Sequence, residues 1–347
     1  MSTLPRTRPA PAVRSRTTAH KGLVHVASRL GHRAEYLELL AATFGLMPSE
    51  GMVGRRNLLS LLRAEALLFA TIDDDYRGFF LVAQLRAALG RRTAGLFLRP
   101  QTCFDRPGLP YRAKRHAFAL LRRLSPVSVF TILPFSVAPE FAEIADDGLI
   151  DPQLWDRPGS PAPVTDPALS TEIAAAARGR RILAFLGTAH SAKGIGFLAQ
   201  LMADPGWPHD EILVIAGGHF PPDTAALAKR LEQHGALVLP RFLSEAELAT
   251  LYARADLIWA CYRPDYDQAS GIFGRAVQLS RMPVVRAGSR IARLARQSGL
   301  AVVELEYDSP DAAARLRAAL TVASPGDAAQ TCAGWKADFI DRLGRAL

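Results

Sequence analysis

The residues best suited to chemistry lie between positions 267 and 285, in the stretch DQASGIFGRAVQLSRMPVV. Ser270 is a favourable helix N-cap, and Gly271 lets a ligand approach the backbone closely. A helix that begins here would turn its free amides and the positive end of its dipole toward an anion, most often phosphate. Arg275, one turn further on, would add a planar cationic fork to the same anion. The alternative is a capped helix that only leads into a core strand, with Arg275 in solvent.

A second phosphate-binding candidate is Lys193, in the loop LGTAHSAKG that follows an apolar run at residues 182–186. The loop is not a P-loop, because it lacks the second glycine before the lysine and the Ser or Thr after it. A lysine at a strand-to-helix turn can still neutralise a diphosphate. Lys193 therefore stays a candidate for the same anion as Ser270.

Two residues of the first half are candidates for a general base. His32 follows the first predicted strand, and its imidazole titrates near neutral pH, although a lone loop histidine is more often simply exposed. The second candidate is Asp74, which lies with Asp73 and Asp75 directly after another predicted strand. Neighbouring carboxylates at that place could share a divalent ion or bind a hydroxyl. They would equally favour the N-terminus of the helix that follows, which is the simpler interpretation.

These residues are positioned by a repeated alternation of short apolar runs and helical segments. The predicted strands are residues 23–27, 66–72, 93–100, 127–135, 182–186, 211–218, 236–243, 256–264, 283–285 and 301–306. Such alternation predicts an α/β fold with parallel sheets and helices on both faces. Ligands of these folds bind at the carboxyl ends of the strands, where the candidate residues lie.

Length and composition set outer bounds. A chain of 347 residues predicts two domains, and a net charge of +9 suggests an anionic partner such as a nucleotide, a nucleic acid or a membrane surface. Three cysteines far apart have neither zinc-ligand nor disulfide spacing, which favours a reducing cytoplasm. We find no apolar run near the ~20 residues of a membrane span and no secretory signal.

The expected organisation has five parts. Residues 1–20 are basic, rich in proline and free of acids, which predicts a disordered tail. Residues 21–150 form a first domain, and the proline-rich residues 151–178 form a linker. Residues 179–325 form a second domain, and residues 326–347 form an amphipathic helix expected to pack back on the first domain.

The second half resembles the donor-nucleotide domain of GT-B glycosyltransferases, in particular the group 1/group 4-like families. The resemblance lies in the order and spacing of four segments: LGTAHSAKG, LVIAGG, LPRFLSEAELATLYARADLIWACY and ASGIFGRAVQLSRMPVV. They cover about residues 180–304, whereas the first half is similar only in its alternating pattern. The resemblance implies two Rossmann-like, doubly wound domains that face a central cleft, with the donor bound to the second and the acceptor to the first.

The resemblance also implies roles for single residues. Lys193 would contact the diphosphate of a nucleotide sugar, with Gly187 and Thr188 lining that turn. Ser270 and Gly271 would present amides to the phosphates, beside Arg275. The base would be bordered by three neighbouring residues: Arg241, Phe242 and Leu243.

The chain departs from the family at its paired glutamates, which in many retaining members lie eight positions apart and hold the donor sugar and the ribose. The corresponding positions here are Gln268 and Ala276. Gln268 can still bind a sugar hydroxyl, whereas Ala276 cannot bind a ribose diol. Arginine often stands where this chain has Thr188. The donor site is therefore altered, and the stereochemistry of transfer stays open.

The resulting hypothesis is a glycosyltransferase that moves a sugar from a nucleotide-diphosphate sugar to a saccharide or lipid-linked acceptor, in cell-surface polysaccharide or glycoconjugate synthesis. Lys193, Arg275 and the helix amides would stabilise the leaving diphosphate, without a metal or other cofactor. Inverting transfer would need His32 or Asp74 as base. The expected location is the cytoplasm, with peripheral contact to the inner face of the membrane.

Three other functions are weighed against this one. A catalytically silent nucleotide-sugar-binding protein would explain the missing glutamates. A sugar-nucleotide epimerase shares the fold but needs carboxylates or histidines around the sugar. A nucleic-acid-binding protein would explain the charge, but the sequence has no zinc-finger, RNA-recognition or single-strand-binding signature, so no nucleic acid is expected.

Overall fold

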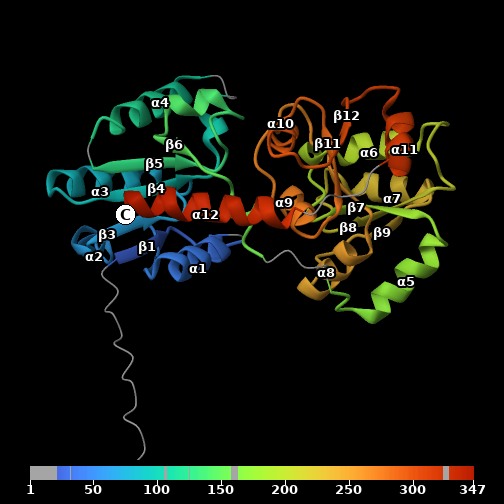
Figure 1. The fold of residues 1–347 in the computed structure, drawn as a ribbon, viewed down its shortest axis with the longest axis horizontal. Helices are drawn as coiled ribbons and strands as arrows, with labels where there is room; N and C mark the ends of the chain where they lie inside the picture. Colours follow the sequence, from blue (N-terminus) through green and yellow to red (C-terminus); the bar gives the residue numbers. More distant parts are fainter. Residues whose placement is uncertain (1–21, 32, 105–107, 125, 158–162, 323–327) are drawn as a thin grey trace, which may run out of the picture.

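The computed structural model describes residues 22–31, 33–104, 108–124, 126–157, 163–322 and 328–347. Within these residues two six-stranded, all-parallel sheets lie side by side, and each carries helices on both faces (Figure 1). The predicted α/β, doubly wound architecture is confirmed. The predicted tail, residues 1–20, and His32 lie outside the described residues.

The first sheet has the strand order β2-β1-β3-β4-β5-β6. Its strands are β1 (Gly22–Val26), β2 (Met47–Glu50), β3 (Ala66–Phe69), β4 (Thr93–Phe97), β5 (Val127–Thr131) and β6 (Asp147–Gly148). Its helices are α1 (Arg33–Phe44), α2 (Leu58–Arg63), α3 (Tyr76–Ala88) and α4 (Leu109–Leu121), with 3-10 turns η1 (Pro100–Cys103), η2 (Pro139–Glu143) and η3 (Pro152–Leu154). One face of this sheet packs on α1, and the other packs on α2, α3 and α4.

The second sheet has the order β12-β11-β10-β7-β8-β9. Its strands are β7 (Arg181–Leu186), β8 (Ile212–Gly217), β9 (Leu237–Leu239), β10 (Leu257–Ala260), β11 (Met282–Arg286) and β12 (Val303–Leu305). Its helices are α5 (Pro167–Ala177), α6 (Ile195–Met202), α7 (Ala225–Gln233), α8 (Glu245–Arg254), α9 (Gly271–Gln278), α10 (Arg290–Gln297) and α11 (Ala312–Val322), with a 3-10 turn η4 (Ser191–Lys193). Because β7 lies between β8 and β10, the strand order reverses there and opens a crevice at the carboxyl ends of β7 and β10.

Strand β7 shows how the sequence produces these layers. Its residues point alternately to opposite faces, as a strand requires. Leu183 and Phe185 join the core cluster with α6, α7 and α11, whereas Ile182, Ala184 and Leu186 join the cluster with α5, α8 and α9. Both faces are apolar, so a continuous apolar run is the expected pattern for such a buried parallel strand.

The stretch 151–178, expected to be a linker, contains regular structure on both sides of residues 158–162, which lie outside the described part of the chain. It begins with η3, whose Leu154 is buried, and it ends with α5, whose Leu169 and Ile173 pack into the core of the second half. The side chains of Asp151 and Asp166 each accept a hydrogen bond from a backbone amide at the start of these elements, which fixes where each one begins.

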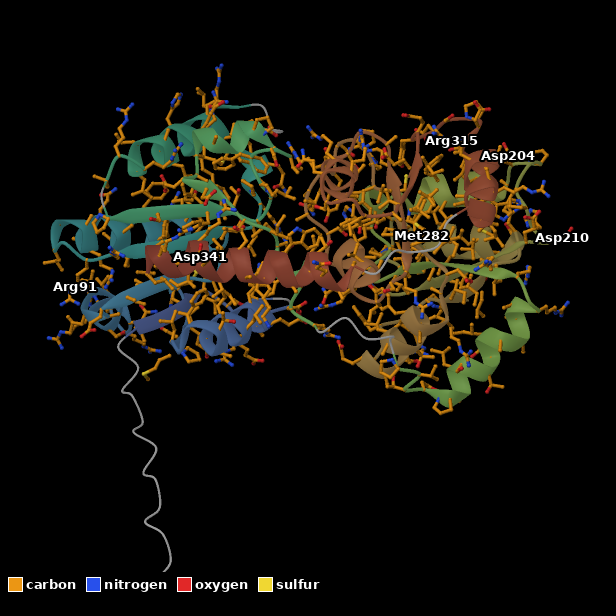
Figure 2. The ribbon with its side chains drawn as sticks, viewed as in Figure 1. Arg91, Asp204, Asp210, Met282, Arg315 and Asp341 are labelled. Atoms are coloured by element: carbon orange, nitrogen blue, oxygen red, sulfur yellow. The ribbon has the colours of Figure 1, made fainter. Side chains whose placement is uncertain are left out.

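The last helix, α12 (Ala329–Ala346), extends from the second half across the first (Figure 1). Phe339 and Leu343 are buried in the core cluster of the first half, and the Phe339 ring lies 4.9 Å from that of Trp155. Arg342 forms an ion pair with Asp147 of β6. The opposite face is solvent-exposed, where Asp341 projects outward and pairs with Arg345 at 2.6 Å (Figure 2). The helix therefore fastens the two halves together.

Candidate functional site

The carboxyl ends of β7 and β10 converge on a cavity of about 630 Å³ between the two halves. Its wall in the second half includes Gly187, Lys193, Ser270 and Gly271. Its wall in the first half and the connecting stretch includes Glu35, Tyr36, Leu98, Arg99, Ile132 and Asp151. The crevice at the strand-order reversal thus brings together most of the predicted phosphate-binding residues.

Helix α9 begins at the cavity, as the sequence predicts. Ser270 is its N-cap, because its hydroxyl oxygen accepts a hydrogen bond of 3.1 Å from the Phe273 amide. The Tyr262 hydroxyl lies 2.8 Å from the same oxygen and fixes its position. Within the described residues the amides of Gly271 and Ile272 have no hydrogen-bond partner, and both residues line the cavity. These amides are available to an anion.

Gly271 and Gly274 both pack closely against η3. A β-carbon at Gly271 would lie 2.4 Å from Oε1 of Gln153, and one at Gly274 would lie 2.5 Å from the Gln153 carbonyl oxygen. The second of these contacts is with backbone, which cannot move aside. Residues 152–154, which form η3, therefore pack directly against the start of α9. The sequence alone does not reveal this contact.

Lys193 lies at the end of η4 with its ammonium group close to the start of the same loop. Its Nζ is 3.4 Å from the position of a β-carbon on Gly187. The Lys193 carbonyl accepts a hydrogen bond of 3.2 Å from the Trp259 indole, which anchors the turn. In the part of the chain that the structure describes, no carboxylate pairs with Lys193, and burial lowers the pKa of its ammonium group. A desolvated cation without a counter-ion is well suited to bind an anion.

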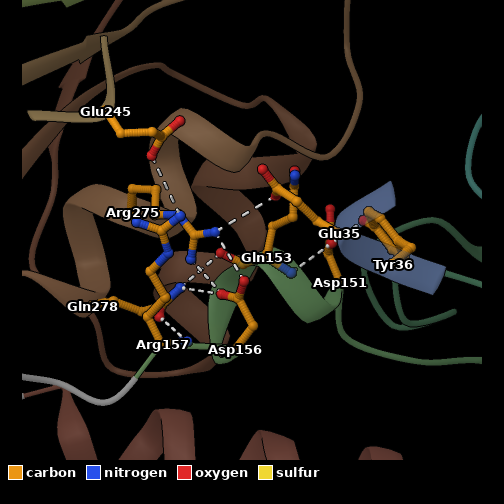
Figure 3. A network of polar contacts seen from close by, with 9 residues as sticks. All are labelled: Glu35, Tyr36, Asp151, Gln153, Asp156, Arg157, Glu245, Arg275 and Gln278. Atoms are coloured by element: carbon orange, nitrogen blue, oxygen red, sulfur yellow. Dashed lines mark hydrogen bonds and ion pairs between the residues drawn. The ribbon is translucent and has the colours of Figure 1, made fainter. Parts of the chain in front are cut away.

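Arg275 is held by protein carboxylates rather than left open. Its guanidinium binds both oxygens of Asp156 in a bidentate pair, the longer of the two bonds being 2.8 Å, and it lies 3.9 Å from Glu35 of α1 (Figure 3). The side chains of Arg275 and Asp156 are only 13% and 14% exposed. Gln278 donates to the Gln153 carbonyl at 2.7 Å and supports the same network. Arg275 lines the cavity, but its strongest contacts are structural.

The three acids after β3 have different partners. Asp73 accepts hydrogen bonds from the Leu98 and Arg99 amides, at 2.8 and 3.0 Å, and burial raises its pKa. Asp74 forms an ion pair with Arg33 and is not among the cavity-lining residues. Asp75 caps α3, so the helix N-terminus interpretation is confirmed for it. No group of three or more potential His, Cys, Asp or Glu ligands for a metal occurs among the described residues.

Asp151 and Tyr36 form a buried pair on the first-half wall of the cavity. The Tyr36 hydroxyl donates a hydrogen bond to Oδ1 of Asp151, and the Gln153 amide donates to the same oxygen at 2.9 Å. Burial raises the pKa of Asp151 to about 6, against the effect of these two hydrogen bonds. Burial, reinforced by the Asp151 charge, also raises the pKa of Tyr36. Both residues follow strands of the first sheet, the place where ligand-binding residues are expected, but the sequence analysis missed them.

The remaining predicted residues are divided between the cavity and its surroundings. Gln268 lines the cavity and accepts a hydrogen bond of 2.5 Å from Gln101, which follows β4 of the first sheet. Thr188 lies in the turn after Gly187 but does not line the cavity. Gln268, the residue predicted to bind the donor sugar, therefore connects the two halves at the cavity.

The three residues predicted to border the base lie outside the cavity lining. Arg241 pairs with Glu247 of α8, and Phe242 is 74% exposed and stacked on His219 with ring centroids 4.7 Å apart. Leu243 packs into the core of the second half. The α8 side of the cavity is lined instead by Glu245, Leu248, Ala249 and Tyr252.

Comparison with known proteins bears on the fold. No protein-family model and no curated protein matches the sequence. A glycosyltransferase from Rickettsia africae ESF-5 matches over 93% of this chain and 94% of its own, with a TM-score of 0.59 and 10% identity. HepE from Anabaena, in complex with UDP and glucose, matches over 94% and 100%, with a TM-score of 0.62 and 10% identity. WaaG, a glycosyltransferase of lipopolysaccharide biosynthesis, matches over 92% and 95%, with a TM-score of 0.53 and 14% identity.

The chain has the GT-B fold. The two parallel six-stranded sheets, the cavity between them and the match over nearly the whole length of these structures agree on this point. The predicted fold is confirmed. Identities of 10% to 14% establish the fold and not the reaction, so the activity rests on the chemistry of the cavity itself.

Proposed function

We propose that this GT-B protein is a glycosyltransferase that uses a nucleotide-diphosphate sugar as donor. One observation carries the proposal: Lys193, without a carboxylate partner in the described residues, lies on the same cavity as the open amides at the start of α9. Both attract negative charge, and both are most effective where charge develops as the diphosphate departs. The solved structures of HepE with UDP show that a protein of this fold binds such a nucleotide.

The acceptor would bind on the first-half wall of the cavity. We propose a saccharide or lipid-linked acceptor, because the wall combines apolar side chains at Leu98 and Ile132 with polar ones at Arg99 and Glu35. Peripheral contact with a membrane, a cytoplasmic location and a role in polysaccharide synthesis stay predictions. In the described part of the chain no helix is long and apolar enough to cross a bilayer.

We further propose that transfer needs no metal. Lys193 and the α9 amides would supply the positive charge that a divalent ion supplies elsewhere. Arg275 would contribute at longer range, since Asp156 already neutralises much of its charge.

The test is a thermal-shift screen of the wild type against UDP, GDP, ADP, CDP and dTDP, each with and without EDTA. A ligand that binds only the folded protein raises the melting temperature with the logarithm of its saturation. We expect one diphosphate to give a shift that EDTA leaves unchanged and that Lys193→Met abolishes. Absence of any shift would overturn the proposed donor site, and a shift lost on adding EDTA would overturn the metal-independent part.

A further inference from the structure

Asp151 combines burial, a fixed position and an open oxygen on the acceptor side of the cavity. Its side chain lines the cavity, yet the residue is only 3% exposed. Both hydrogen bonds that it accepts, from the Tyr36 hydroxyl and the Gln153 amide, end on Oδ1. Among the described residues no donor is assigned to Oδ2. One oxygen therefore positions the carboxylate, while the other remains able to accept a proton.

We propose that Asp151 is the general base of the transfer and takes the proton of the acceptor hydroxyl on Oδ2. This inference rests on the proposed glycosyl transfer. The acceptor O–H bond breaks and its proton passes to Asp151. The acceptor oxygen then forms a bond to the anomeric carbon of the donor sugar. The bond from that carbon to the diphosphate breaks, and its electron pair leaves with the nucleoside diphosphate near Lys193. Attack from the face opposite the leaving group inverts the anomeric configuration.

The other acids near the cavity are less suited to this task. The described residues place three carboxylates in the lining, at Glu35, Asp151 and Glu245. The Glu35 side chain is 52% exposed and lies 3.9 Å from Arg275, too far for a hydrogen bond that would hold it in place. The Glu245 side chain is 81% exposed and belongs to the second half. Asp151 is the buried member of the three, and a base must be held within hydrogen-bond reach of its substrate.

The surroundings of Asp151 also set its protonation. The pKa near 6 that follows from burial leaves the carboxylate charged at pH 7 yet more basic than an exposed aspartate. Four groups adjust it: the Tyr36 hydroxyl, the Gln153 amide and the Arg275 charge lower the pKa, and the Asp156 charge raises it. The activity of the enzyme should accordingly fall as the pH drops through about 6.

The decisive variant is Asp151→Asn, because the new amide keeps an oxygen for Tyr36 and Gln153 but cannot accept the proton. The donor probe is the glucose conjugate of whichever nucleoside diphosphate stabilises the wild type, and the acceptors are a panel of octyl glycosides and water. We expect an unchanged Kd for the diphosphate, a kcat lowered by about 100-fold or more, and a wild-type glycoside product of inverted configuration by NMR.

Two further variants separate the base from a merely structural role. Tyr36→Phe keeps the carboxylate but removes a donor that favours its charged form, so the acidic limb of the kcat profile should move to higher pH. Asp147→Asn alters a neighbouring carboxylate that pairs with Arg342 and does not line the cavity, and its kcat should stay within about twofold of the wild type.

The outcomes distinguish failure of the base from failure of the proposed function. A wild type that binds none of the five diphosphates overturns the transfer reaction and the base together. Transfer with retained configuration, or a kcat within a few-fold of wild type for Asp151→Asn, leaves the transferase standing and overturns the base. Diphosphate binding without transfer or hydrolysis overturns the base and supports a binding protein.

Discussion

The two sheets share one architecture but differ in how the polar groups at their carboxyl ends are paired. In the first half Asp74 is neutralised by Arg33, and Asp75 caps α3. In the second half Lys193 and the first amides of α9 have no partner among the described residues. Paired groups stabilise the fold, whereas a buried group left unpaired has a cost that a ligand can relieve. The difference supports the proposal that the edge of the second sheet binds the anionic part of the donor.

Arg275 is the exception within the second half, since it is paired with Asp156 as Asp74 is paired with Arg33, and its pair is less exposed to solvent. Replacement of Arg275 should therefore lower the stability of the fold more than it weakens ligand binding. We expect Arg275→Ala to lower the free energy of unfolding by about 3 kcal/mol, because a poorly exposed carboxylate loses its partner. The shift of the urea unfolding midpoint measures this. A double variant, Arg275→Met with Asp156→Leu, should recover most of the loss, and a single variant that weakens diphosphate binding without destabilising the fold would contradict this view.

Asp151 should differ from Arg275, because its charged side chain lowers the stability of the fold and its replacement should raise it. Its folded-state pKa of about 6 lies above its ordinary 3.8, so the folded protein binds this proton more tightly than the unfolded chain. The wild type thus loses stability as the pH rises through 6, and Asp151→Asn does not. We expect the variant to be more stable at pH 8 by about 2 kcal/mol, with the gain vanishing near pH 4. Melting temperatures of both proteins between pH 4 and pH 8 measure this difference. A variant less stable than the wild type at pH 8 would contradict the claim that burial disfavours the charged form of Asp151.

Ser270 tests the cap that presents the α9 amides. Ser270→Ala removes the oxygen that accepts from the Phe273 amide and contacts the Tyr262 hydroxyl, both buried. We expect a loss of about 1 kcal/mol in stability and a few-fold weaker diphosphate binding, since the first turn is less well fixed. Ser270→Thr, which keeps the hydroxyl, is the control. Equal losses in both variants would show that packing and not capping matters.

Asp74 gives the smallest effect and the sharpest contrast with Lys193. The Asp74 and Arg33 side chains are each 23% exposed, so water screens the pair. We expect Asp74→Asn to cost about 1 kcal/mol or less and to leave diphosphate affinity and kcat unchanged. Thermal unfolding and calorimetric titration measure the two quantities. A large loss of kcat would support Asp74 as the base. It would also contradict the claim that the paired groups at the carboxyl edge of the first sheet have only a structural role.

The sequence predicts most of the second half because its signals are local. The apolar run of β7 and the N-cap at Ser270 are properties of short segments, and the structure confirms them. In the first sheet, the edge strands β2 and β6 escaped prediction. β2 contains a proline and is largely exposed, and β6 has only two residues, so neither has an apolar pattern to recognise.

The site is harder to predict because its decisive contacts join distant segments. Arg275 and Asp156 are 119 positions apart, and Tyr36 and Asp151 are 115 apart. An arginine one turn into a helix looks available for phosphate until its partner is known. Asp151 lies in a proline-rich stretch whose composition indicates a linker, which hides a residue that the fold buries. Local chemistry singled out Lys193 and Ser270, and both line the cavity, whereas pairing between the two halves could not be inferred.

The central claim is that Lys193 and the start of α9 bind the diphosphate of the donor. The most direct test is calorimetric titration of the wild type and Lys193→Met with the nucleoside diphosphate found by the screen and with the corresponding nucleoside. The ratio of the two affinities isolates the diphosphate contribution. We predict that this ratio falls by about 30-fold or more in Lys193→Met, with nucleoside affinity unchanged, as expected for a loss of about 2 kcal/mol. An equal ratio in both proteins would contradict the account.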